Sequence, residues 1–368
     1  MAGRRKASVT RASTCHYPVR CVQVRRDQRY SGQDRPPMSP TLRIGLLGAA
    51  RITPKAVCRP AHIVGRCSLR GLAARDRARA SQFAGAHGVE EVFDSYESLI
   101  ASDEIDLIYN PLPINLHAEW TIKALEAGKH VLCEKPFAMN ADEARAMLAA
   151  ADKSGKRVIE AFHYRYHPAF QQCLDWIAEG RIGDIKAVDA EFSVAIRDSD
   201  NEIRQLPDTG GGAMMDLGCY PLNWLLNLVG GNIEPIDAEA VLTRRGVDER
   251  LTATLDAGGA RISITTSMAG GQPFEAHLDI QGSKGYIRFN NPLAPHTGGS
   301  LKLLDADNRL KEDAPISPIS TYTWQLAAIV EALETGAPLP TEGDIILRQQ
   351  KAIDAIYESA GLRGLRYR

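Results

Sequence analysis

Three side chains have the types and spacing needed to transfer a proton to a carbonyl oxygen: Lys135, Asp216 and Tyr220. Lys135 follows a short apolar run, whereas Asp216 and Tyr220 lie four residues apart in an apolar segment that predicts a helix. Residues at this spacing share one helix face. A carbonyl that accepts hydride develops negative charge on oxygen, which requires a proton donor or a cation. We expect Tyr220 to exchange the proton, assisted by Lys135 and Asp216.

The phenol is the group whose proton affinity would have to change. A free tyrosine has a pKa of about 10, so catalysis near neutrality asks for a pKa of roughly 7, at a cost of about 4 kcal/mol. We expect the ammonium of Lys135 to lower the pKa of Tyr220 in this way. Each residue also has a plainer interpretation. Lys135 could be a surface lysine, and Tyr220 could be a core aromatic whose hydroxyl bonds to backbone.

A second group of residues has the spacing of a dinucleotide phosphate turn. Gly48, Ala50 and Thr53 follow an apolar run in the pattern Gly-x-Gly-x-x-Gly, with small residues in place of two glycines. Backbone N–H groups of such a turn can approach a pyrophosphate. Taken alone, the pattern is equally typical of a buried strand that ends in a plain turn. The residues assigned to cofactor binding here are Gly48, Ala50, Arg51 and Ile52.

The end of the next apolar strand bears on which dinucleotide binds. An acidic residue at this point bonds the ribose hydroxyls of NAD, but the chain has Ala74 there, followed by Arg75 and Asp76. A missing carboxylate beside a guanidinium fits the 2′-phosphate of NADP. We therefore expect NADP as the preferred cofactor, with Arg75 in contact with it. Asp76 keeps NAD open, and Arg75 could simply begin a solvated helix.

Apolar runs that alternate with helical segments predict the scaffold for these residues. In the first half, strands separated by helices predict an α/β fold with right-handed crossovers and a doubly wound parallel sheet of Rossmann type. Lys135 would lie at its carboxyl edge, where ligands bind. The predicted strands are 42–47, 69–73, 105–110, 130–133 and 157–161, and the predicted helices are 75–86, 116–127 and 141–153.

The second half changes to the pattern of an α+β domain with a mostly antiparallel, open sheet. The predicted domains are 41–165 for nucleotide binding and 166–368 for substrate and oligomer contacts. Residues 1–40 are rich in arginine and lack periodicity, which predicts a disordered tail or a mis-assigned start. The predicted strands are 185–196, 239–243, 251–255, 261–267, 275–281 and 286–289, and the predicted helices are 168–180, 213–228, 324–335 and 345–360.

Composition excludes several classes of function. The chain has 44 basic and 45 acidic residues, which leaves no electrostatic footprint for nucleic acid or an anionic membrane. Its seven cysteines contain no Cys-x-x-Cys pair, so a disulfide framework or a metal site is not expected and a reducing, cytoplasmic environment fits best. No apolar run reaches the roughly 18 residues that a membrane span needs.

Three segments, in this order, closely resemble the glucose–fructose oxidoreductase, inositol dehydrogenase and rhizopine-catabolism family. They are 118–136, which ends in Glu-Lys-Pro; 160–168; and the glycine-rich segment 210–220. The resemblance runs over roughly residues 42 to 360, and it is nearest to the dihydrodiol dehydrogenase and 1,5-anhydrofructose reductase branch. One departure is visible, because the usual Pro-Asn after the third strand reads Pro113-Ile114, with Asn115 one place later.

This resemblance implies hydride exchange between NAD(P) and a sugar, polyol or diol, and a dimer or tetramer built through the C-terminal sheet. Two alternatives stay open: a non-catalytic NAD(P)-binding sensor, and a redox-assisted glycosidase or epimerase with tightly bound NAD. A sensor has no need of a proton donor, which favours the enzyme. Further cofactor contacts are assigned to Pro111, His117, Glu134 and Lys135, and substrate contacts to Arg165 and His163.

Overall fold

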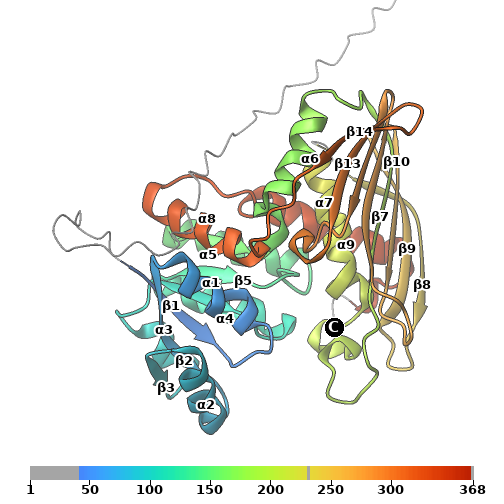
Figure 1. The fold of residues 1–368 in the computed structure, drawn as a ribbon. Helices are drawn as coiled ribbons and strands as arrows, with labels where there is room; N and C mark the ends of the chain where they lie inside the picture. The colour runs from blue at the N-terminus through green and yellow to red at the C-terminus, as the bar shows by residue number, and fades with distance from the viewer. Residues whose placement is uncertain (1–40, 230–232, 366–368) are drawn as a thin grey trace, which may run out of the picture. The chain divides into compact units, whose positions relative to one another are not determined.

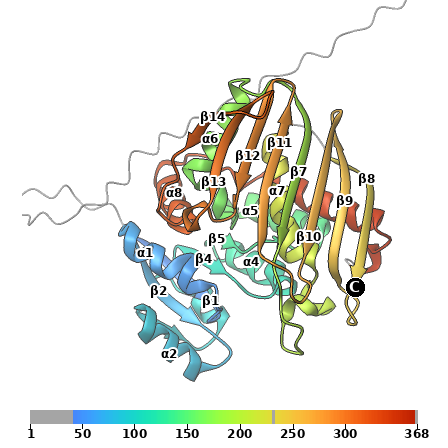
Figure 2. The same ribbon diagram turned by 45° about the vertical axis from the view of Figure 1, so that its right-hand side comes forward.

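The structure is a computed structural model that describes residues 41–229 and 233–365. The prediction made for residues 1–40 lies outside this range. A parallel sheet occupies the first half of the described chain and a larger mixed sheet the second, each with helices packed against it (Figures 1 and 2).

Within the described residues, the first half forms a six-stranded parallel sheet in the order β3-β2-β1-β4-β5-β6. This is the strand order of a doubly wound nucleotide-binding fold. All five predicted strands are confirmed, and β3 is an addition that is too short for its periodicity to be recognised. The strands are β1 (Leu42–Leu47), β2 (Cys67–Ala73), β3 (Glu91–Phe93), β4 (Leu107–Asn110), β5 (His130–Cys133) and β6 (Val158–Glu160).

Helices cover this sheet, and one of them comes from near the end of the chain. Helix α8 (Thr321–Thr335) packs Leu326 and Ile329 into the same apolar cluster as Ile44 and Leu46 of β1. Thr321, at the first turn of α8, is thereby brought beside the turn that follows β6. The other helices of this half are α1 (Arg59–Val64), α2 (Arg77–His87), α3 (Tyr96–Ala101), α4 (His117–Glu126) and α5 (Ala141–Ser154).

The second half of the described chain forms an eight-stranded sheet in the order β14-β13-β12-β11-β7-β10-β9-β8. The predicted antiparallel character is confirmed for every neighbouring pair of the described strands except β7 and β10, which are parallel. The edge strand β14 and its neighbour β13 were not predicted. The strands are β7 (Ile185–Ser193), β8 (Glu234–Leu242), β9 (Asp248–Ala257), β10 (Ala260–Ser267), β11 (Glu275–Gly282), β12 (Gly285–Asn290), β13 (Ser300–Asp305) and β14 (Leu310–Ala314).

One face of the larger sheet is covered by helices, as Figure 2 shows. Trp176, Trp224 and Ile353 from three helices pack against Leu278 and Ile287 of the sheet in one apolar core. Alternation along β7 places Val188 and Ala190 on this covered face, as the period of a strand requires. The covering helices are α6 (Pro168–Ala178), α7 (Cys219–Leu228) and α9 (Asp344–Ser359).

The segment that carries Asp216 and Tyr220 begins as a π-helical turn, Met214–Gly218, and continues as α7. Its N-terminus is held by the buried Asp248, whose carboxylate accepts hydrogen bonds from the Met214 N–H at 2.7 Å and from the Tyr357 hydroxyl at 2.7 Å. Gly212 has a φ of 128°, and the Asp248 carboxylate occupies the space that a Cβ there would need. The glycine-rich segment therefore lets this carboxylate approach the helix start.

Candidate active site

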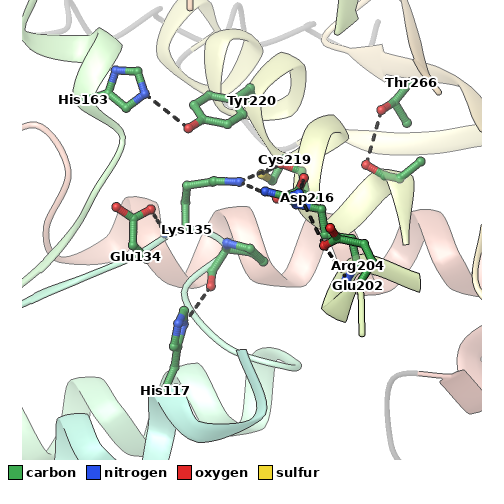
Figure 3. Close-up of polar contacts among 12 residues, drawn as sticks. His117, Glu134, Lys135, His163, Glu202, Arg204, Asp216, Cys219, Tyr220 and Thr266 are labelled. Carbon is green, nitrogen blue, oxygen red and sulfur yellow. Dashed lines mark hydrogen bonds and ion pairs between the residues drawn. The ribbon is translucent and has the colours of Figure 1, made fainter. Parts of the chain in front are cut away.

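Lys135 and Asp216 form a buried ion pair that links the two sheets (Figure 3). The ammonium of Lys135, just beyond the end of β5, donates to the backbone oxygen of Asp216 at 2.7 Å and to its Oδ1 at 2.9 Å. The other carboxylate oxygen, Oδ2, lies 2.8 Å from Nε of Arg204. The side chains of Lys135 and Asp216 are 13% and 20% exposed. The pair is nearly dry, so its charges interact strongly.

The pKa values of this pair move in the directions that keep both residues charged. Burial is the largest influence and would lower the pKa of Lys135, but Asp216, Cys219 and Glu134 together outweigh it and the pKa is raised. Burial would likewise raise the pKa of Asp216, but Lys135 and Arg204 outweigh it and the pKa is lowered. A fixed positive charge therefore stands at the carboxyl edge of the parallel sheet.

Tyr220 lies over this charge. The ammonium of Lys135 is 5.0 Å from the centre of the Tyr220 ring, so the structure brings together the two residues paired from the sequence. The expected lowering of the phenol pKa is wrong for this structure. Burial is the main cause that raises the pKa of Tyr220 well above 10, and electrostatic interactions with Tyr322 and Glu134 act in the same direction. The phenol is only 5% exposed, and the ammonium of Lys135 is paired with Asp216.

His163 is the hydrogen-bond partner of the phenol. Its Nε2 lies 3.3 Å from the Tyr220 hydroxyl, and its Nδ1 lies 2.8 Å from Oγ1 of Thr321 (Figure 3 shows the first contact). The side chain is 3% exposed, and burial lowers its pKa well below 6.5. His163 therefore stands beside the proposed proton donor as a neutral ring.

The side chain of Arg165 forms hydrogen bonds to residues of helices α6 and α7. Its Nε donates to Oδ1 of Asn227 at 2.7 Å, and its Nη1 donates to Gln171 at 3.3 Å. Asn227 is seven residues beyond Tyr220 along the chain, which corresponds to about 10 Å of helix. These contacts give no support to a substrate-binding role for Arg165, which stays a prediction.

Both ring nitrogens of His117 lie against backbone oxygens. The residue is 1% exposed, its Nδ1 lies 3.1 Å from the oxygen of Pro136, and its Nε2 lies 2.8 Å from the oxygen of Leu112. Burial lowers its pKa to about 4. His117 therefore joins the segments that follow β4 and β5. Its contact with the cofactor, and that of Pro111, stay predictions.

Two acidic residues, Glu134 and Glu160, lie near Lys135, Asp216 and Tyr220, which we call the Lys135 group. Glu134 accepts a hydrogen bond from the Tyr109 hydroxyl at 2.7 Å, and burial raises the pKa of Glu134. Glu160, at the end of β6, is 1% exposed, and its Oε1 has no hydrogen-bond partner. Burial raises the pKa of Glu160 to about 8. The sequence analysis did not single out Glu160, because nothing in its spacing shows that it is buried.

The phosphate turn has the geometry that a dinucleotide needs. Gly48 has a φ of 79°, in the region that favours glycine, and its N–H donates to the oxygen of Ala73 at 2.7 Å. The turn continues through Ala50 and Ile52 into the helical segments Pro54–Cys58 and α1, so a helix follows the turn as in a dinucleotide site. The residues present therefore fit an NAD(P) cofactor.

Charged side chains surround this turn. Arg51 is 81% exposed at its side chain and lies 3.4 Å from Oε2 of Glu202, a neighbour of Arg204 in the second half. Arg79, which the sequence analysis missed, donates to the oxygen of Ala49 at 2.8 Å. Arg75 is exposed at the end of β2. The carboxylate of Asp76 accepts from the N–H of Arg79 at 3.0 Å and so caps helix α2.

The described residues contain neither a cluster of metal ligands nor a helix able to cross a membrane. Among them, no group of three or more histidine, cysteine, aspartate or glutamate side chains could hold a metal ion. No described helix combines the length and the apolar character that crossing a membrane requires.

Comparisons with known proteins agree with this arrangement. Residues 42–162 match a model described as an oxidoreductase family with an NAD-binding Rossmann fold, and residues 170–288 match the GFO/IDH/MocA C-terminal domain. D-xylose 1-dehydrogenase (NADP(+)) 2 of Haloferax volcanii is 33% identical over 86% of this chain and 96% of its own length. The trans-1,2-dihydrobenzene-1,2-diol dehydrogenase of Xenopus laevis is 34% identical over 53% of this chain and 59% of its own.

A solved structure has the same fold as this chain. A 3-ketoreductase from Actinomadura kijaniata, crystallised with NADP and TDP-benzene, superposes with a TM-score of 0.79 at 28% identity, over 87% of this chain and 98% of its own. The family models together cover more than half of the chain. The protein therefore belongs to the GFO/IDH/MocA family and is an NAD(P)-dependent oxidoreductase.

Proposed function

We propose that the protein interconverts a carbonyl and an alcohol on a sugar, polyol or diol, with Tyr220 exchanging the proton and Lys135 and Asp216 holding the positive charge beside it. The observation that supports this most strongly is the meeting of these three side chains at the carboxyl end of β5. Ligands of open α/β sheets bind at this edge. A buried ion pair is costly to maintain, which fits a role in chemistry.

In the proposed reaction, the cofactor transfers the hydride and the protein transfers the proton. A nicotinamide bound at this edge supplies the hydride in reduction and accepts it in oxidation. In reduction, the O–H bond of Tyr220 breaks and its proton forms the new O–H bond on the substrate oxygen. The ammonium of Lys135 stabilises the negative charge that develops during this step. Because burial raises the pKa of Tyr220, the phenol is protonated at neutral pH, as a donor must be.

The end of β2 favours NADP over NAD. The position that holds the ribose-binding acid is occupied by Ala74, and the nearby carboxylate of Asp76 is engaged by the start of α2. Arg75 is exposed beside it and is free of the helix cap, so its guanidinium can bind a 2′-phosphate. Two of the relatives described above carry NADP in their names or crystals.

We further propose that the open face of the larger sheet forms a homodimer or tetramer contact. This face carries Asp189, His277 and Asp279 and is hollowed beside the exposed Phe274. The exposed fraction of Phe274 is 55%, which is high for a large aromatic. Light scattering of the purified protein should give a mass above that of one chain, and a strictly monomeric mass at all concentrations would contradict this.

The test is an assay of the purified protein with NADP⁺ and NAD⁺ on D-xylose, trans-1,2-dihydrobenzene-1,2-diol and a panel of polyols. We expect release of NADPH, faster than release of NADH. Release also separates a dehydrogenase from an enzyme that keeps NAD tightly bound. The proposal fails if neither NADPH nor NADH binds at micromolar concentration, measured by nicotinamide fluorescence.

The role of Tyr220 is tested by the Tyr220→Phe variant. Loss of a general acid lowers turnover by about 10²-fold or more, whereas the affinity for NADPH should be unchanged. Tyr-to-Phe and Lys-to-Ala variants of the Actinomadura kijaniata 3-ketoreductase have been crystallised with TDP-benzene and NADP, so such substitutions are compatible with folding in a relative. Unchanged turnover would remove Tyr220 from the mechanism.

A further inference from the structure

The Tyr220 hydroxyl is partnered by a ring that lies between two hydroxyl groups. His163 belongs to a short 3₁₀ turn, His163–Tyr166, directly after β6. Its Nε2 lies 3.3 Å from the Tyr220 hydroxyl and its Nδ1 lies 2.8 Å from Oγ1 of Thr321. Three segments that are far apart in the sequence thus form one chain of hydrogen bonds that ends on the phenol.

This chain is fixed and dry. His163 is 3% exposed and Thr321 is fully buried, so water does not compete for either contact. The ring of His163 stacks on that of Tyr322, with centroids 3.9 Å apart and an interplanar angle of 30°. A ring held on one face by an aromatic and on both nitrogens by hydroxyls has no free rotation. The only freedom left is the position of its proton.

The ring is neutral. Burial lowers the pKa of His163 well below 6.5, and the positive charges of Lys55 and Lys135 act in the same direction. Tyr220, Tyr322 and Thr321, which also face the ring, are uncharged at neutral pH. A neutral imidazole has one N–H and one lone pair, so the two ring nitrogens play opposite roles.

The two tautomers have opposite consequences for proton transfer. With the proton on Nδ1, the ring accepts from Tyr220, and the phenolic hydrogen points at His163 and away from any substrate. With the proton on Nε2, the ring donates to the phenol oxygen, and the phenolic hydrogen is free to point at the substrate. The same N–H then stabilises the phenolate that remains after the proton has left.

We propose that His163 is a positioning residue for proton transfer, held in its Nε2–H tautomer by a hydrogen bond that Thr321 donates to Nδ1. The inference rests on the proposed function, because it requires Tyr220 to exchange the proton. In reduction the phenolic O–H bond breaks, the proton joins the substrate oxygen, and the phenolate accepts from the Nε2–H of His163. Water restores the proton to Tyr220 once product has left, and His163 itself neither gains nor loses one.

The tautomer can be read without a substrate. Full-length protein with ¹⁵N-labelled histidine is examined by long-range ¹H–¹⁵N NMR at neutral pH, and the signals of His163 are assigned by their loss in the His163→Phe variant. We expect the Nε2–H form in the native protein and in Thr321→Ser, which keeps the hydroxyl. Thr321→Val should lose this preference, and its shifted signals give the assignment if His163→Phe does not fold. An Nδ1–H form or an imidazolium in the native protein overturns the proposal.

Kinetics supply the second readout, using D-xylose first and otherwise the alcohol that the screen identifies. We expect His163→Phe to lower kcat by about 10-fold and Thr321→Val by about 3-fold, with KM within about twofold of native. In oxidation Tyr220 accepts the proton, and loss of the Nε2–H donor makes its phenolate less stable. The limb of the oxidation pH profile on which activity rises with pH reports deprotonation of this base, so it should move to higher pH by about one pH value.

A double-mutant cycle separates positioning from general damage. In a Tyr220→Phe background, His163→Phe should have little further effect, because its partner is gone. Losses that multiply would show that His163 acts independently of the phenol and would overturn the inference. If Tyr220→Phe alone has no effect, the proposed function fails; if it lowers turnover and the His163 loss multiplies with it, only this inference fails.

Discussion

Two lysines in the nucleotide-binding half make the same set of contacts in very different surroundings. Lys135 pairs with Asp216 at 2.9 Å and lies 5.0 Å from the centre of the Tyr220 ring. Lys123, on the outer side of α4, pairs with Glu119 at 2.6 Å and lies 4.0 Å from the centre of the Trp120 ring. By distance alone, the contacts of Lys123 would be judged stronger than those of Lys135.

Burial reverses that ranking. The side chains of the Lys123 pair are 42% and 50% exposed, against 13% and 20% for the Lys135 pair. Water screens the outer pair, so it contributes little. In the less exposed group, burial is the largest influence on the pKa of Lys135 and Asp216, and each residue stays charged because of its charged neighbours. Charge that is kept against burial supports the proposed site.

The comparison predicts the largest difference for loss of the lysine charge. Lys135→Met should lower kcat/KM by about 10³-fold, because the positive charge beside the substrate oxygen is removed. Lys123→Met is the matched control and should leave kcat/KM unchanged. Steady-state assays of both variants, with NADPH binding measured by fluorescence, separate lost chemistry from lost binding. Equal activities in the two variants would contradict the distinction between the sites.

A second prediction uses Glu160, the buried acid on the inner side of the Lys135 group. Its pKa is raised to about 8, so the folded protein holds a proton there that the unfolded chain releases at lower pH. This costs stability as the pH rises from the unfolded pKa of about 4.5 toward 8, on the order of 5 kcal/mol in full. Glu160→Gln keeps the shape and removes the charge, so it should stabilise the protein at alkaline pH.

Thermal unfolding as a function of pH checks this. The melting temperature of Glu160→Gln should match that of the native protein near pH 4.5 and exceed it by about 5 °C at pH 8. Glu119→Gln, which alters an exposed acid, serves as the control and should show no such trend. The prediction is contradicted if the variant loses stability relative to the native protein between pH 5 and pH 8. Such a loss would mean that the Glu160 carboxylate is charged in the folded protein and stabilises it.

The sequence indicates the parallel sheet well, because its strands are continuous apolar runs that only a sheet covered on both faces can bury. It also indicates that Lys135 lies at the carboxyl edge, since that position follows from the strand alone. Elements such as β3, of three residues, carry too little pattern to be recognised. The edge strand β14 and its neighbour β13, which are half-exposed and rich in polar residues, were missed as well.

The site itself depends on contacts that spacing cannot reveal. Asp216 meets Lys135 across 81 positions, and His163 meets Thr321 across 158. The raised pKa of Tyr220 could not be predicted either, because it follows from burial, which is a property of the fold. The resemblance to a family supplied the residues, whereas the partners of each residue came from the structure. Arg204 was missed because it lies outside the three segments that carried the resemblance.

The smallest expected effect belongs to the exposed pair of Glu119 and Lys123, and it tests whether this pair contributes to the free energy of unfolding. Glu119 lies in the first turn of α4, four residues before Lys123, which is the favourable order for such a pair. Glu119→Gln should lower the free energy of unfolding by about 0.5 kcal/mol at low salt, and the difference should vanish in about 1 M salt, where screening is nearly complete. Urea unfolding at both salt concentrations measures it. A loss above about 2 kcal/mol, or one that salt leaves unchanged, would show that this pair is not solvated and that exposure fails to separate the two lysines.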